Sequence, residues 1–213
     1  LTADGRTAVY NSTATDLVPG DGNASADIFA TTLDLVPLTF CTAGLSNNGC
    51  QASMGASGVP SASASSGFVL TTTSVDGARS GMYFYGVDNF GFEPTPWGAG
   101  SSSLCVKSPA QRTTLLSSGG NAGDCSGVLT LDWSAYIAAN PGALGAPFAA
   151  GDRVQVQAWF RDPGNALNSS LSNALRVVLA PSRFRLDGGR DVAASDAQRT
   201  PRVALSRATS RPP

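Results

Sequence analysis

The residue types that most often carry out catalysis are scarce in this sequence. It contains no histidine, which excludes a Ser-His-Asp triad, a histidine general base and an imidazole metal ligand. Serine chemistry with a lysine base would depend on Lys107 alone, and no S-x-x-K motif precedes that residue. A glycosidase pair of carboxylates would draw on Glu93, in a loop with prolines, and on Asp132 and Asp162 beside predicted strands. Their spacing places no two of them together, so we expect a protein that is not an enzyme and uses no cofactor.

The acidic loop "DGNASAD" (21–27) offers oxygen ligands of the kind that calcium prefers. Asp21, Asn23 and Asp27 would supply them. These are fewer than the roughly six to eight ligands that Ca²⁺ takes, and the EF-hand pattern with its final glutamate is absent. The alternative is a turn whose carboxylates accept hydrogen bonds from backbone amides. Both interpretations stay open, and we assign no metal site.

Aromatic residues gather in the segment that ends near Trp97, where they could stack against sugar rings. Strand alternation places Tyr83 and Tyr85 on one face and Phe84 on the other. Trp159 lies opposite the apolar face of its predicted strand, beside two glutamines. The candidates for ligand contact are Tyr85, Trp97 and Trp159. The alternative is that these rings pack in the core, so a sugar-binding domain would expose Trp97 or Trp159 and a structural module would bury them.

Four cysteines indicate disulfides rather than zinc. A zinc site favours closely spaced C-x-x-C pairs or histidines, and the chain has neither. Three connectivities are possible for four cysteines. We expect the pairs Cys41–Cys50 and Cys105–Cys125, since each closes a short polar loop. Two disulfides imply an oxidising compartment, which favours a secreted or cell-surface protein.

The composition favours many short strands joined by turns. Glycine (24 residues) and proline (13) are frequent, and only 14% of residues are charged. The clearest alternation lies in 153–160, where Val154 and Val156 share a face. A similar face in 173–180 carries Leu175 and Val177, and we expect these four side chains to be buried and adjacent. Further strands are predicted at 7–13, 27–33, 68–75, 81–87, 103–106, 112–117 and 127–133, and one short helix at 134–140 with Ser134 as its N-cap.

The charge of the chain is divided unevenly. Residues 1–181 carry seven basic and twelve acidic residues, a net charge of −5, whereas residues 182–213 carry seven arginines and three aspartates, a net charge of +4. This tail has one aromatic residue and no sustained period, so we expect it to be disordered. Without interleaved aromatic residues, the arginines do not favour nucleic-acid binding over a plain extension. No apolar run is long enough for a membrane span.

The opening stretch combines a DGR turn at 4–6, the strand sequence "TAVYNST", the spacer "ATDLVPGDGN" and the segment "ADIFATTL". In this combination residues 2–35 resemble the end of a WD40-like (TolB-type) β-propeller repeat. The resemblance implies a partial blade in which the DGR turn joins two strands and the D-I-F segment begins a third. Because the pattern does not return, we expect the chain to hold the last blade of an array, with upstream blades as its partners.

A second set of landmarks runs through the rest of the chain: "FC" at 40–41, "GC" at 49–50, "SLCVKSPAQRT" at 103–113, "DCSGVLTLDWSAY" at 124–136 and "VQAWFRDP" at 156–163. Residues 39–180 thereby resemble an uncharacterised C-terminal module of large secreted bacterial proteins. That family has no assigned activity, so the resemblance implies secretion and a β-rich appendage and transfers no catalytic residue. Within the last landmark, Arg161 and Asp162 could pair across the strand end.

These observations predict an all-β chain in three parts. They are a partial β-propeller blade (1–36), a disulfide-stapled antiparallel β-sandwich (38–181) and a disordered basic tail (182–213). The expected function is that of a non-catalytic structural or interaction module at the C-terminus of an exported bacterial repeat protein. The alternative is a carbohydrate-binding accessory domain, whose partner would be a glycan or a cell-surface component. We expect no nucleic-acid partner and no membrane span.

Overall fold

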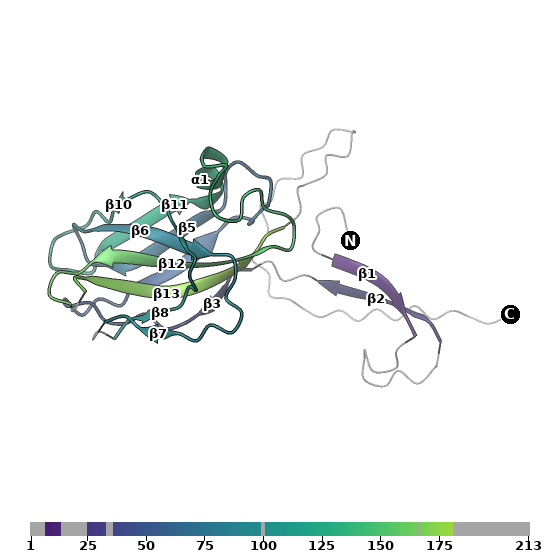
Figure 1. Ribbon diagram of the computed structural model, residues 1–213, viewed down its shortest axis with the longest axis horizontal. Coiled ribbons are helices and arrows are strands. Elements are labelled where there is room, and N and C mark those ends of the chain that lie inside the picture. Colours follow the sequence, from purple (N-terminus) through teal and green to yellow (C-terminus); the bar gives the residue numbers. More distant parts are fainter. Residues whose placement is uncertain (1–6, 14–24, 33–35, 99–100, 166, 181–213) are drawn as a thin grey trace.

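The described part of the chain is mostly β-structure, arranged in antiparallel sheets with one short helix (Figure 1). The computed structural model describes residues 7–13, 25–32, 36–98, 101–165 and 167–180. The predicted disordered tail (182–213) and two of the calcium candidates, Asp21 and Asn23, lie outside these ranges. For the described residues, the expectation of a mainly β fold with antiparallel sheets is confirmed.

Two sheets form the body of the fold. The larger has the strand order β10-β6-β12-β13-β3, and β9 also pairs with β6. Its strands are β3 (Leu38–Phe40), β6 (Ser80–Gly86), β9 (Gln111–Arg112), β10 (Leu116–Ser117), β12 (Arg153–Arg161) and β13 (Ser169–Val178). The smaller has the order β11-β5-β4, built from β4 (Ser53–Ser57), β5 (Val69–Val75) and β11 (Gly127–Asp132).

Alternating side chains on the central strand β12 explain how the two sheets share a core. Val154 and Val156 are buried, and in the antiparallel register they stand opposite Val177 and Leu175 of β13, which are buried too. The adjacency and burial predicted from the alternation are therefore confirmed. Residues of the smaller sheet complete the same apolar cluster, namely Met54, Leu70, Val75 and Leu129.

Tyr83 links the two sheets across this core. It lies on β6, and its hydroxyl donates to the carbonyl oxygen of Leu129 at 2.8 Å and accepts from the Thr72 hydroxyl at 3.1 Å, both in the smaller sheet. Burial raises the pKa of Tyr83 to about 12, because the phenolate would lose its hydration, and the hydrogen bond from Thr72 offsets only part of that rise. The core thus accommodates the neutral phenol.

The opposite face of the larger sheet is also covered. Gln155 and Gln157 alternate with the apolar residues of β12, yet both are buried. The Gln157 side chain accepts from the Cys105 amide at 3.0 Å and donates to the carbonyl oxygens of Ser103 and Ser172. Ser103 belongs to β8 (Ser103–Leu104), which pairs with β7 (Thr95–Pro96). The segment that carries these short strands therefore lies against the sheet and shields Gln157 from water.

The helix, α1 (Trp133–Ala139), follows β11 directly. Its N-cap is Asp132, whose carboxylate accepts a hydrogen bond from Ala135 N at 2.9 Å. The predicted cap, Ser134, is wrong by two residues, because Asp132 already satisfies a free amide of the first turn. The helix ends before Asn140 and Pro141, as the proline predicts.

The disulfides join different cysteines from those that the short loops predicted. The pairs are Cys41–Cys105, with Cα atoms 6.3 Å apart, and Cys50–Cys125, with Cα atoms 5.3 Å apart. A backbone hydrogen bond from Ser46 N to the Cys50 carbonyl oxygen already closes the turn before Cys50. The fold instead brings each cysteine beside a segment that is distant in the sequence. The expectation of two disulfides is confirmed, and the expected pairing Cys41–Cys50 and Cys105–Cys125 is wrong.

Strands β1 (Thr7–Ser12) and β2 (Asp27–Thr32) form a two-stranded antiparallel sheet of their own. Tyr10 stands opposite Phe29, and their rings stack with centroids 5.7 Å apart. Val9 and Ile28 remain 54% and 76% exposed. Figure 1 shows this β1–β2 pair apart from the two larger sheets, and none of the pair's described side chains belongs to their core.

Candidate functional site

The sequence-predicted aromatic candidates come from three different places in the fold. Tyr85 is fully buried on β6, and its hydroxyl donates to the carbonyl oxygen of Leu144 at 2.9 Å. Its ring lies near those of Trp133 and Phe148, at centroid distances of 5.8 and 6.5 Å. Burial, with the nearby Tyr136 hydroxyl, raises its pKa. Tyr85 is therefore a core residue, and its assignment as a surface contact for a ligand is corrected.

Trp97 and Trp159 are both half-buried. Trp97 follows β7, and its Nε1 donates to the Ser169 hydroxyl at 3.1 Å, which anchors the ring to β13. Trp159 lies on the outer face of β12, in register with Leu171 and Met82. Each ring is therefore less exposed than the stacking platform of a sugar-binding protein and more exposed than a core residue. Because Tyr85 is buried, the three rings do not form one binding surface.

Two of the three carboxylates considered for catalysis, Asp132 and Asp162, form hydrogen bonds that stabilise the fold. Asp162 is buried and accepts hydrogen bonds from Asn47 N at 3.0 Å and from the Ser170 hydroxyl at 2.6 Å. Asp132 caps α1, and Glu93 is exposed in its loop. Among the described residues Arg161 forms no ion pair with Asp162, so the expected pair is wrong. The reason is that backbone and hydroxyl donors already surround the carboxylate.

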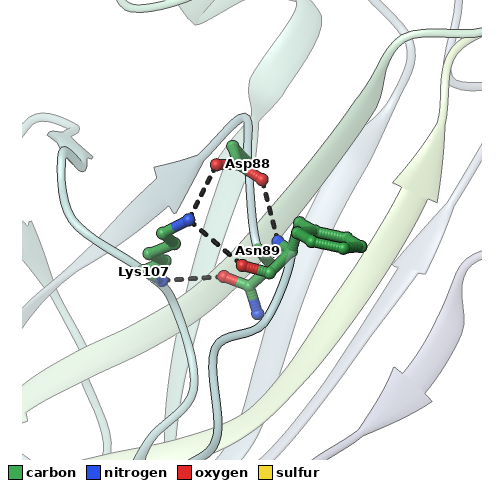
Figure 2. Close-up of polar contacts among 4 residues, drawn as sticks. Asp88, Asn89 and Lys107 are labelled. Atoms are coloured by element: carbon green, nitrogen blue, oxygen red, sulfur yellow. Dashed lines mark hydrogen bonds and ion pairs between the residues drawn. The ribbon is translucent and has the colours of Figure 1, made fainter.

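The loop that follows β6 is held by hydrogen bonds and an ion pair from Lys107 in the neighbouring segment (Figure 2). The Lys107 ammonium donates to Asp88 Oδ2 at 2.8 Å and to the Phe90 carbonyl oxygen at 3.1 Å. Its backbone amide donates to Asn89 Oδ1 at 2.7 Å, and the Asn89 side chain donates to the carbonyl oxygen of Cys105. The hydrogen bond from Lys107 holds the pKa of Asp88 below its usual range.

This bracing presents Phe90 to solvent. The ring is 91% exposed, while the Phe90 amide donates to Asp88 Oδ1 at 2.8 Å and the carbonyl oxygen accepts from Lys107. Because Asn89 bonds to Cys105, the loop is also tied to a disulfide-linked segment. Phe90 is not among the candidates selected from the sequence, although its turn sequence Asp-Asn-Phe-Gly, with an aspartate that can accept from the amide two residues on, is a usable signal.

The described residues contain no group of three or more histidine, cysteine, aspartate or glutamate side chains that could hold a metal ion. Within the same ranges, no helix has the length and apolarity needed to cross a membrane.

Comparison of the chain with known protein families, with curated proteins and with solved structures finds no match. The two resemblances drawn from the sequence therefore depend on the landmark residues alone.

Proposed function

We propose that this chain is a non-catalytic structural or interaction module of an exported bacterial repeat protein. Residues 38–181 would form a disulfide-stapled antiparallel β-sandwich, and residues 1–36 the end of a β-propeller repeat. The two disulfides support an oxidising, extracellular location. The buried polar side chains of Asp162 and Gln157 bind backbone groups, which supports a structural role for them.

The observation that carries this proposal is the exposed apolar surface of the β1–β2 pair. A lone two-stranded sheet is marginally stable in water, whereas a propeller blade typically has four strands. Val9, Tyr10 and Ile28 are all exposed, although residues of these types are usually buried. A neighbouring blade would cover these three side chains. Upstream blades of the parent protein are therefore the proposed partner.

Amide hydrogen exchange tests this proposal. Amides in 7–12 and 27–32 should exchange roughly a hundredfold faster, or more, than those in 153–160, because the β1–β2 pair lacks a core of its own. A shortened chain that starts at Leu38 should keep the slow exchange of 153–160. The control is the intact chain, measured under the same non-reducing conditions.

Two results together would contradict the proposal. They are protection in 7–32 equal to that in 153–160, and unfolding of the shortened chain. The opening stretch would then belong to the same folded unit as β12, and it would not be the end of a propeller repeat.

Phe90 favours a second candidate function, that of a carbohydrate-binding accessory domain. Its exposed ring offers a flat apolar face of the kind on which sugar rings stack. The hydrogen bond that Lys107 donates and the one that Asp88 accepts fix the loop before any ligand arrives, so binding would cost little ordering of the loop. A glycan or cell-surface component would be the partner of this loop.

A glycan array separates the two candidates. If the second function holds, the intact chain should retain one class of glycan, and Phe90→Ala should weaken that binding by roughly fivefold to tenfold through loss of ring stacking. Leu115→Ala is the matched control, because Leu115 is also a large exposed apolar residue, and it should change nothing. An array on which no glycan is retained, or binding that Phe90→Ala leaves intact, would count against this function.

A further inference from the structure

A pocket of about 450 Å³ opens at the end of the larger sheet, where β6 begins and β12 ends. In the antiparallel register Phe160 stands opposite Gly81, which brings Ser80 and Arg161 close to each other on adjacent strands. The turn before β6 and the loop after β12 complete the walls. The lining residues are Ala78, Arg79, Ser80, Arg161, Pro163 and Asn168.

Two arginines in this pocket carry positive charge that no described acidic residue pairs with. The Nε of Arg79 is buried and has no hydrogen-bond partner. Arg161 is exposed at the strand end, and its neighbour Asp162 is engaged by Asn47 and Ser170 instead. A buried N–H group without an acceptor is unfavourable, because it has lost its hydration. The Nε itself is closed to solvent, so an anion in the pocket would instead interact with the positive charge of the two guanidinium groups.

The backbone supplies a second, independent observation. Two non-glycine residues of the lining have left-handed backbone angles, Ala78 with φ 55° and Asn168 with φ 50°. This conformation is unfavourable for alanine, because its Cβ approaches the backbone carbonyl. Hydrogen bonds from Ala78 N to the Gly119 carbonyl oxygen and from Asp162 N to the Asn168 carbonyl oxygen hold it in place. Backbone strain of this kind clusters at ligand-binding sites.

We propose that this pocket binds a small hydroxylated carboxylic acid, of about the size of a hexuronic acid, with its carboxylate between Arg79 and Arg161. The planar guanidinium group matches a carboxylate in geometry as well as charge. The volume falls in the lower part of the range for small-molecule sites, about 300–1,000 Å³, and leaves room for more than a bare inorganic anion.

The rest of the lining indicates what the carboxylate is attached to. Ser80 and Asn168 carry neutral hydrogen-bonding groups suited to hydroxyls, and Ala78 and Pro163 offer apolar surface suited to ring carbons. The pocket and the Phe90 loop belong to different segments of the chain. This inference therefore goes beyond the function proposed above, and either can fail without the other.

Calorimetric titration of the whole chain with glucuronate, glucose and inorganic phosphate tests the proposal. Glucuronate should bind saturably and at least about tenfold more tightly than glucose, since only glucuronate engages the arginines. Arg161→Gln should weaken glucuronate binding about tenfold or more. Arg153→Gln is the matched control, because Arg153 is an exposed arginine at the other end of the same strand, and it should leave binding unchanged. Arg161 is exposed, so the variant should fold, and an unchanged circular dichroism spectrum verifies this.

Three results would overturn the proposal. They are equal binding of glucose and glucuronate, tighter binding of phosphate than of glucuronate, and an Arg161→Gln variant that binds like the original chain. The first would show that the carboxylate is not recognised, the second that the pocket selects a bare anion, and the third that the ligand binds elsewhere.

Discussion

Replacing Val156 with aspartate should lower the free energy of unfolding by several kcal/mol, on the order of 4 kcal/mol. Val156 is 1% exposed on β12, the strand that lies between β6 and β13 in the larger sheet. In the register it stands opposite Leu175 on one side and Tyr85 on the other, both buried. An aspartate there would place a carboxylate among apolar side chains that offer it no ion partner. Protonation would remove the charge but leave an unsatisfied polar group.

Urea unfolding followed by fluorescence measures this effect as a lower midpoint. Val128→Asp is the matched control, because Val128 lies on β11 of the smaller sheet and is 41% exposed. Its carboxylate would remain in water, so the change should stay within about 1 kcal/mol. A midpoint that Val156→Asp leaves unchanged would show that the core lies on the other face of β12.

Local alternation explains why this part of the core could be predicted from the sequence. The side-chain period of a strand is two, so the valines of 153–160 must share one face whatever the rest of the chain does. The predicted range matches β12 (Arg153–Arg161) to within one residue. The predicted range 127–133 matches β11 (Gly127–Asp132) equally well.

Strand β4 could not be predicted from local alternation. Its sequence, SMGAS, contains no β-branched or aromatic residue, and no strand was predicted there. It is a strand because β5 pairs with it and because the Asn173 side chain accepts from Met54 N at 2.6 Å and donates to the Met54 carbonyl oxygen at 3.0 Å. Asn173 lies on β13 of the other sheet, so the cause is a contact across the fold.

The candidate sites were harder to predict for the same reason. The exposure of Phe90 depends on Lys107, and the pocket at Arg79 and Arg161 depends on the register between β6 and β12. The burial of Tyr85 follows from core-facing residues of both sheets and the rings of α1 and Phe148 around it. None of these relations can be inferred from spacing along the chain. The wrong disulfide pairing has this origin too, because short loops were preferred over contacts that only the fold creates.

Removing the Cys50–Cys125 disulfide should lower the free energy of unfolding by about 4 kcal/mol, as a double variant Cys50→Ala/Cys125→Ala. The link spans a sequence separation of 75 residues, and the other link spans 64. Loops of these lengths restrict the unfolded chain strongly, and the chain-entropy relation gives about 4 kcal/mol for each. Under the short-loop pairing the same double variant would break both links, which are worth about 3 kcal/mol each, and the loss would be about 6 kcal/mol. The size of the loss therefore reports on the connectivity as well as on stability.

The measurement combines urea unfolding with peptide mapping under non-reducing conditions. Mapping of the unaltered chain should return peptides that join Cys41 to Cys105 and Cys50 to Cys125. The control is Cys41→Ala/Cys105→Ala, which should lose a similar amount of stability and still yield the Cys50–Cys125 peptide. A variant that lacks Cys50 and Cys125 should in turn keep its link between Cys41 and Cys105. Recovery of a Cys41–Cys50 peptide from the unaltered chain would contradict the pairing, and with it the placement of the Cys105 segment beside the end of β3.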